Sequence, residues 1–161
     1  MNQKLKIISV VLFLCACTSE PNQDVKQAPK KPNLKIEIPK FNSDSAYYYV
    51  QQQVDFGPRV ISSKSWQNCA IWLEKKFLQY TTNVMVQEAP ITTYDGKNHT
   101  LKNIIASFSP NKKNRIALFA HWDSRHIADH DIENQDSPIL GANDGGSGVG
   151  VLIELARQFS I

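Results

Sequence analysis

The chain has 161 residues, a size that suits one small domain, and its formal net charge is +3. Much of the positive charge lies between Lys26 and Lys40, and loss of a leader with Lys4 and Lys6 would leave 16 basic against 15 acidic residues. Proteins that read nucleic acid concentrate basic charge on their folded part, so this composition argues against a nucleic-acid partner.

The first residues have the pattern of an exported lipoprotein. A basic start precedes the apolar run IISVVLFL, which is too short to span a bilayer as a mature helix and ends at LCAC. This ending resembles the bacterial lipobox, which implies cleavage before Cys17 and acylation of its thiol. We therefore predict a lipoprotein signal peptide at 1–16, a lipidated tether at 17–42 and a membrane-anchored protein of the bacterial cell envelope, in the periplasm or at the outer membrane. A membrane-anchoring apolar segment with incidental cysteines is the alternative.

The composition of the mature chain fits a domain without disulfides. With Cys17 acylated, Cys69 would be the remaining thiol, so no intramolecular disulfide could form. Residues 18–40 contain four prolines and many charges, which is typical of an extended, solvated tether.

Two helices are expected after the tether. The first spans 45–56, with Ser43 or Asp44 as its cap and the Gly57–Pro58 pair as its end. The second spans 63–80, where apolar side chains recur at steps of three and four and form one stripe. We interpret this stripe as core packing rather than as a binding platform. Its members are Trp66, Cys69, Ile71 or Trp72, Leu73, Phe77 and Tyr80.

The period then changes to that of strands. Residues 83–91 and 101–109 are rich in β-branched side chains, and the Asp95–Gly96 pair between them predicts a hairpin. Residues 115–121, RIALFAH, are apolar almost throughout, which is the pattern of a strand buried on both faces. Residues 150–159 return to a helical pattern. This order of elements predicts an α/β sandwich with a mixed sheet.

Acidic and histidine residues crowd the segment after the predicted strand 115–121. In open α/β sheets, ligands bind beyond the carboxyl ends of the strands. Six carboxylates close together repel one another unless solvent or a cation offsets them, and this donor set suits Zn²⁺ or another divalent ion. A solvated acidic loop is the alternative. The carboxylates belong to Asp123, Asp129, Asp131, Glu133, Asp136 and Asp144, and the histidines are His121, His126 and His130.

Two histidine patterns compete within this segment. His126 and His130 are spaced like the ligands of a zincin helix, but Ile127 stands where such proteases need a glutamate. His121 lies directly at the end of the predicted strand, where a rigid scaffold aims side chains. Asp123, two residues later, could orient the His121 imidazole on a metal. His121 and Asp123 are therefore the better pair.

The stretch GANDGGSGVG at 141–150 could cradle a phosphate or present a carboxylate. Its glycines fit neither the Rossmann nor the P-loop spacing, and no lysine follows Lys113. Asp144 would also place a negative charge where a phosphate should bind. We interpret the glycines as backbone relief that lets a carboxylate project and the next helix pack closely. Asp144 is thus predicted to bind a metal ion that it shares with His121.

These motifs resemble the M28 zinc peptidase family. HWDSR at 121–125 and PILGANDGGSGVGVLIELAR at 138–157 are similar to its bacterial glutaminyl-peptide cyclotransferase (glutaminyl cyclase) branch, as are VDFGPRV at 54–60 and NCAIWLEKKF at 68–77. The resemblance implies a phosphorylase/hydrolase-like sandwich of the zinc aminopeptidase type. Residues 43–161 would form its amino-terminal half, as a partial catalytic domain.

One departure from the branch is visible. The branch usually shows Pro-Gly-Ser after the valine, where this chain has Ile61, Ser62 and Ser63. The change bears on the turn that leads into the second helix and not on the metal site.

The resemblance also implies an activity and a cofactor, Zn²⁺. Cyclases of the branch hold one zinc through an aspartate matching Asp144 and through a glutamate and a histidine later in the chain. Two-metal aminopeptidases also use the histidine matching His121. The implied substrate is a peptide with an amino-terminal glutamine, which becomes pyroglutamate with loss of ammonia. His121 and Asp123 are the expected catalytic residues.

Two alternatives stay open, an M28 metallo-aminopeptidase and a lipid-anchored non-catalytic module. The chain stops at Ile161, before the segments that supply the later ligands of the family. We therefore expect this polypeptide alone to be truncated and without turnover, and a second chain could carry the missing half.

Overall fold

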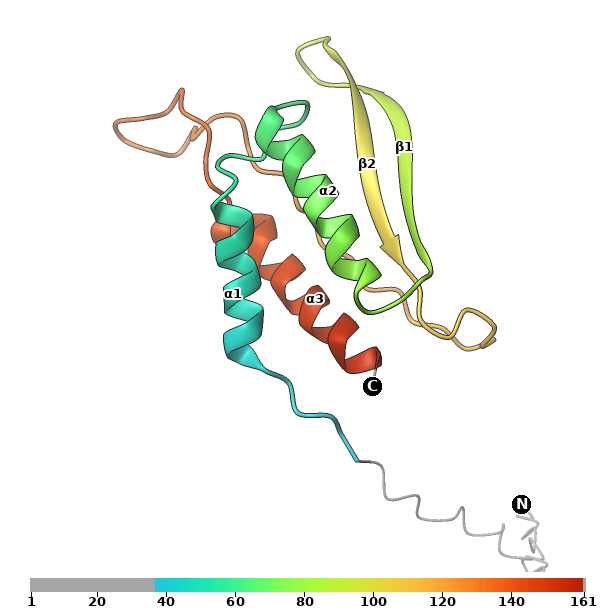
Figure 1. Cartoon of the computed structure of the whole chain (residues 1–161). Coiled ribbons are helices and arrows are strands. Elements are labelled where there is room, and N and C mark those ends of the chain that lie inside the picture. The colour runs from blue at the N-terminus through green and yellow to red at the C-terminus, as the bar shows by residue number, and fades with distance from the viewer. Residues whose placement is uncertain (1–36, 161) are drawn as a thin grey trace, which may run out of the picture. The chain divides into compact units, whose positions relative to one another are not determined.

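The computed structural model describes residues 37–160, so the predicted signal peptide, the lipidation site Cys17 and most of the predicted tether lie outside the described residues. The elements are shown in chain order in Figure 1. They are α1 (Ser43–Val54), α2 (Lys64–Leu78), β1 (Val84–Thr92), β2 (Asn98–Ala106), the turn η1 (Ala142–Ser147) and α3 (Gly148–Phe159). Within residues 37–160, every helix is too short or too polar to cross a membrane.

Helix α1 is capped by Asn42, and the predicted caps, Ser43 and Asp44, were wrong. The Asn42 side chain accepts a hydrogen bond from the backbone N–H of Ser45 at 3.0 Å. The backbone N–H of Asn42 also donates to the carboxylate of Glu154, in α3, at 2.8 Å. Asparagine is as good a helix cap as serine or aspartate. The bond to Glu154 therefore explains why the helix begins after Asn42.

Helix α2 confirms the predicted apolar stripe. Its cap is Ser63, whose hydroxyl accepts from the backbone N–H of Trp66 at 3.1 Å. Trp66, Cys69 and Leu73 are buried on one face of the helix. In Figure 1, α2 lies between the hairpin and α3, so this face closes the core of the described residues.

The turn before α2 forms even though the usual glycine is replaced by Ser62. This serine has φ 68°, in the left-handed region that favours glycine. Its hydroxyl lies 2.8 Å from Nδ1 of His99 in β2. The departure from the Pro-Gly-Ser pattern therefore places a serine in a backbone conformation that glycine adopts at lower cost.

The predicted hairpin is confirmed. Strands β1 and β2 pair antiparallel, from Val84 opposite Ala106 to Thr92 opposite Asn98. Gly96, with φ 79°, lies in the turn between them. This two-stranded sheet is the one sheet among residues 37–160, so the predicted mixed sheet is not formed within them.

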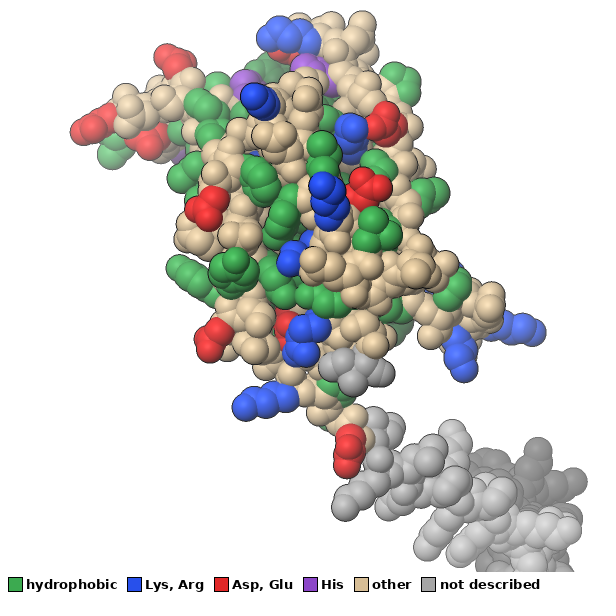
Figure 2. Space-filling model, viewed as in Figure 1, with side chains coloured by type: hydrophobic (Ala, Val, Ile, Leu, Met, Phe, Trp, Pro, Cys, Tyr) green, Lys and Arg blue, Asp and Glu red, His purple; other side chains and the backbone are tan. Residues whose placement is uncertain are grey.

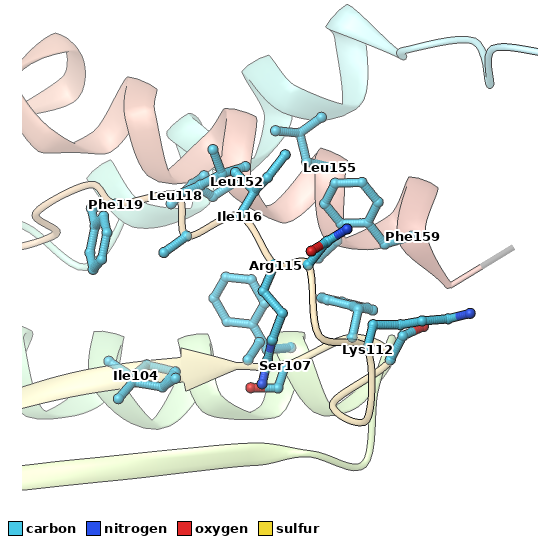
Figure 3. Close-up of a pocket in the computed structure, with 18 residues that line it drawn as sticks. Ile104, Ser107, Lys112, Arg115, Ile116, Leu118, Phe119, Leu152, Leu155 and Phe159 are labelled. Carbon is cyan, nitrogen blue, oxygen red and sulfur yellow. The ribbon is translucent and has the colours of Figure 1, made fainter. Parts of the chain in front are cut away.

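The predicted buried strand at 115–121 is wrong for the described structure. The segment pairs with no strand among residues 37–160, and Ile116 and Phe119 are each 89% exposed. A strand needs neighbours on both sides to satisfy its backbone and cover its side chains. A cavity of about 660 Å³ separates this segment and α3 from Ile104 in β2 (Figure 3). Apolar side chains line most of it.

Helices α1 and α3 approach each other closely. A Cβ atom at Gly150 would lie 2.6 Å from the carbonyl oxygen of Ala46, so glycine permits this contact. Beside it, the buried carboxylate of Glu154 accepts from Arg157 at 2.7 and 2.8 Å. The Arg157 guanidinium lowers the pKa of Glu154 to about 2, and the backbone N–H of Asn42 adds to this effect. Gly150 thus permits the close packing of α1 and α3 just after the turn η1, which directly precedes α3.

Replacing Ser62 by glycine should relieve backbone strain. We expect Ser62→Gly to be at least as stable as the wild type, and more stable than Ser62→Ala by about 1 kcal/mol. Both variants lose the bond to His99, so the difference between them isolates the backbone. Urea unfolding at neutral pH would measure it. Equal free energies of unfolding for the two variants would contradict a strained turn.

The exposed apolar segment should make the chain self-associate. We expect the purified chain to form oligomers as its concentration rises, and the double variant Ile116→Lys with Phe119→Lys to remain monomeric over the same range. The matched control is Ile132→Lys, because Ile132 is 96% exposed but lies in the acidic loop. Sedimentation velocity would show the difference. A double variant that associates like the control would place the contact elsewhere.

Candidate metal centre

Residues 121–124 alternate between solvent and the core. Trp122 and Ser124 are buried, whereas His121 and Asp123 are exposed on the other side, as expected of an extended segment. The Trp122 ring stacks on Trp66 of α2, with ring centroids 5.2 Å apart, and its indole N–H donates to the carbonyl of Lys102 at 3.1 Å. The core thus holds the segment in register and directs His121 and Asp123 outwards.

His121 lies between two carboxylates. Its Nε2 atom is 3.0 Å from Oδ1 of Asp144, and its Nδ1 atom is 3.4 Å from Oδ1 of Asp123. Nδ1 is also 3.3 Å from the backbone oxygen of Asp123. A proton on Nδ1 can bond to Asp123, which leaves Nε2 facing Asp144.

The turn η1 brings Asp144 to the histidine. Asp144 and Gly145 interrupt the helical path, with ψ 100° and φ 86° respectively. A Cβ atom on Gly145 would lie 2.9 Å from two atoms of the His121 ring, so a side chain there would displace the imidazole. Both its φ and this close approach require glycine at 145. The loop therefore presents the carboxylate of Asp144, as predicted, rather than a phosphate-binding site.

The remaining acidic residues do not join this group, and the prediction of one six-carboxylate cluster was wrong. Asp129 forms an ion pair with Arg125, and Asp131 accepts backbone N–H groups of its own loop. Figure 2 shows acidic side chains gathered on a projecting loop, where they are exposed to solvent. Asp129 and Asp131 have partners within their own loop and do not point toward a common centre.

The second histidine pattern is also dispersed. His126 packs against Tyr94 of the hairpin turn, with Nε2 3.1 Å from the tyrosine hydroxyl. His130 is 91% exposed and lies 3.9 Å from Asp129. The structure therefore does not bring His126 and His130 together as a pair.

Sequence reasoning missed Arg59, which is fully buried behind the site. Its guanidinium donates to the backbone carbonyl of Trp122 and to that of Gly141. Burial lowers the pKa of Arg59, and the charge of Asp123 is among the opposing influences. A single arginine has no characteristic spacing, so its position in the VDFGPRV motif was the only available signal.

The donors fit zinc in kind but fall short in number. Two ligands of one tetrahedral zinc lie about 3.3 Å apart, close to the 3.0 Å between His121 Nε2 and Asp144 Oδ1. Asp123 lies on the opposite ring nitrogen, where it would orient the imidazole. Among residues 37–160, however, no three His, Cys, Asp or Glu side chains are placed to hold one metal ion. A catalytic zinc needs three protein ligands.

Residues 103–161 match the model of Peptidase family M28. The chain is similar to the glutaminyl cyclase of Tannerella forsythia, with 50% identity, a TM-score of 0.74 and coverage of 76% of this chain and 43% of that one. It is also similar to a Zn-dependent exopeptidase from Parabacteroides distasonis, with 47% identity, a TM-score of 0.75 and coverage of 77% and 43%. A leucine aminopeptidase precursor from Bacteroides thetaiotaomicron is 49% identical, with a TM-score of 0.75 and coverage of 78% and 44%.

These comparisons confirm the predicted fold class. At such identity, the described residues share the α/β architecture of glutaminyl cyclases and zinc exopeptidases. The chain spans less than half the length of each of these solved relatives. The names of the three relatives cover both cyclase and exopeptidase activities.

Zinc binding should depend on the two facing side chains. We expect His121→Ala and Asp144→Asn each to weaken zinc binding to the purified chain by more than about 10-fold, and Asp123→Asn to weaken it by about 10-fold through the orientation of the imidazole. Isothermal titration calorimetry at neutral pH would measure these affinities.

The control for zinc binding is His130→Ala, since that side chain is exposed and outside the site. Its affinity should equal that of the wild type. If His130→Ala lost as much zinc affinity as His121→Ala, the ion would bind the acidic loop and the assignment would be wrong.

Proposed function

We propose that this chain, whose residues 103–161 match the model of Peptidase family M28, has the function of a zinc-dependent glutaminyl-peptide cyclotransferase. Its substrate would be a peptide with an amino-terminal glutamine, and its products pyroglutamyl peptide and ammonia. The observation that supports the proposal is the carboxylate of Asp144, presented by the turn η1 in a chain whose sequence is 50% identical to that of a protein named as a glutaminyl cyclase.

The reaction makes simple demands on the site. The α-amine of the glutamine attacks its own side-chain amide carbon, so a C–N bond closes the ring and the C–N bond to the amide nitrogen breaks. A proton moves from the amine to that nitrogen, which leaves as ammonia. Zinc, when bound, polarises the amide carbonyl. The reaction therefore conserves atoms and charge and needs no further reactant.

The described residues would contribute metal binding and orientation. Asp144 offers an exposed carboxylate oxygen, and Gly145 permits its approach to His121. Asp123 fixes the tautomer of His121 through Nδ1, so that Nε2 is free on the Asp144 side. A proton shuttle and further zinc ligands would come from outside residues 37–160, since these hold no third donor at the pair.

A metallo-aminopeptidase is the second candidate. One relative is named as a leucine aminopeptidase precursor and another as a Zn-dependent exopeptidase, at nearly the same identity as the cyclase. The direct contact of His121 with Asp144 favours this candidate, because two-metal enzymes use both side chains. A non-catalytic module, the third candidate, would bind no stoichiometric zinc.

We infer further that the apolar face at Ile116 and Phe119 is covered in the working enzyme by the rest of an M28 fold. More than half the length of each solved relative lies outside its alignment with this chain. The cavity between β2 and α3 offers an apolar surface to the polypeptide that would complete the fold. That polypeptide could be a continuation of this chain or a second chain. The lipid anchor at Cys17 and the envelope location stay predictions.

Activity can be tested by complementing the chain. We expect the purified chain with zinc to show no turnover, because His121 and Asp144 are too few ligands for catalytic zinc. Joined to the carboxy-terminal part of the Tannerella forsythia cyclase, it should release ammonia from a glutamine-initial peptide, and the same hybrid with Asp144→Ala should not.

The products of the hybrid decide between the candidates. Ammonia release supports the cyclase, whereas free leucine from a leucine-initial peptide would replace it with the aminopeptidase. A folded hybrid that binds zinc and turns over neither peptide would contradict both activities.

A further inference from the structure

We propose that Arg59 is a positioning residue that fixes the spacing of His121 and Asp144. The inference rests on the metal site proposed above and names a residue that touches neither the metal nor the substrate. It starts from an unusual feature, a fully buried guanidinium directly behind the two site segments.

The guanidinium of Arg59 bridges three separate parts of the backbone. Nε donates to the carbonyl of Trp122 at 2.8 Å, and Trp122 stands between His121 and Asp123. Nη1 donates to Leu140 at 2.8 Å and to Gln53, in α1, at 3.1 Å. Nη2 donates to Gly141 at 2.9 Å. One side chain thus ties the histidine segment, the start of the aspartate turn and α1.

The backbone of Arg59 holds the histidine segment from the same side. Its N–H donates to the hydroxyl of Ser124 at 2.8 Å, and its carbonyl accepts from the N–H of Ser124 at 3.1 Å. On the other side, the carbonyl of Gly141 also accepts from Gly146, which closes the turn around Asp144. Arg59 therefore contacts both segments next to the residues that would bind zinc, at Trp122 and at Gly141.

The electrostatic cost of burying Arg59 indicates that its role is to hold the backbone in a fixed geometry. Among residues 37–160, no carboxylate lies within ion-pair distance of Arg59, so backbone carbonyls alone satisfy its charge. Burying a cation without a partner charge is costly, and burial lowers the pKa of Arg59. An apolar side chain would fill the space at lower cost. Only the planar fork of an arginine can donate to several carbonyls at once in fixed directions.

A metal site tolerates little change in the distance between its donor atoms. His121 and Asp144 come from segments 23 residues apart in the chain, and zinc requires their donor atoms about 3.3 Å apart. Without the guanidinium, the carbonyls of Trp122, Leu140 and Gly141 lose their shared donor. The two segments can then separate, and the paired donors no longer meet at one ion.

The test compares Arg59→Lys with Arg157→Lys in the purified chain. Both changes remove guanidinium hydrogen bonds, but Arg157 binds Glu154 within α3 and contacts neither site segment. We expect Arg59→Lys to weaken zinc binding by about 10- to 100-fold, the range for residues that orient ligands, and Arg157→Lys to change it less than about 2-fold. Calorimetry at a temperature where both variants are folded would measure this.

A second readout needs no metal. Amide hydrogen exchange by NMR should become faster at Ser124 and at Gly146 in Arg59→Lys and stay unchanged at both in Arg157→Lys, because their bonds join or flank the two segments. If Arg59→Lys does not fold, Ser124→Ala removes one bond of the same link and should give a smaller change of the same sign.

The outcomes separate the two proposals. A wild-type chain without zinc affinity would overturn the metal site, while the exchange rates would still decide the role of Arg59. A folded Arg59→Lys chain with wild-type zinc affinity and wild-type exchange at both amides would overturn the positioning role.

Discussion

The site depends on the space between the backbone of Gly145 and the ring of His121. Any side chain at 145 would occupy that ring's position, so the carboxylate of Asp144 reaches the imidazole only because this residue is glycine. Buried residues on the inner side of the site hold Asp144 and His121 in this contact. Trp122 fixes one partner through the core, and Arg59 joins it to the other. Helix α1 contacts the turn through Gln53, whose side-chain amide donates to the carbonyl of Gly146.

Local signals predicted the parts of the structure that are decided locally. The stripe from Trp66 to Leu73, the hairpin at Asp95–Gly96 and the projection of Asp144 each follow from periodicity or backbone freedom within a few residues. The proximity of Asp144 to His121 was also expected. The expectation placed His121 at the end of a strand, however, and that strand is not formed among residues 37–160.

The remaining features depend on partners that local sequence does not name. Residues 115–121 have the composition of a buried strand, but burial requires neighbouring strands, and residues 37–160 supply none beside them. For the acidic loop, the sequence predicted that the carboxylates converge. In the structure, Asp131 accepts a backbone N–H group and Asp129 pairs with Arg125, all within the loop. Arg59 went unnoticed because its four carbonyl partners come from positions that no periodic pattern connects.

The alternation of residues 121–124 has a consequence for the substitutions that this segment can accept. The inward residues, Trp122 and Ser124, set the register, and the outward residues, His121 and Asp123, meet the solvent. Substitutions on the outer side can therefore retune chemistry while the inner side preserves the scaffold. The groups that this segment presents to solvent and the contacts that hold its backbone in register are therefore physically separate.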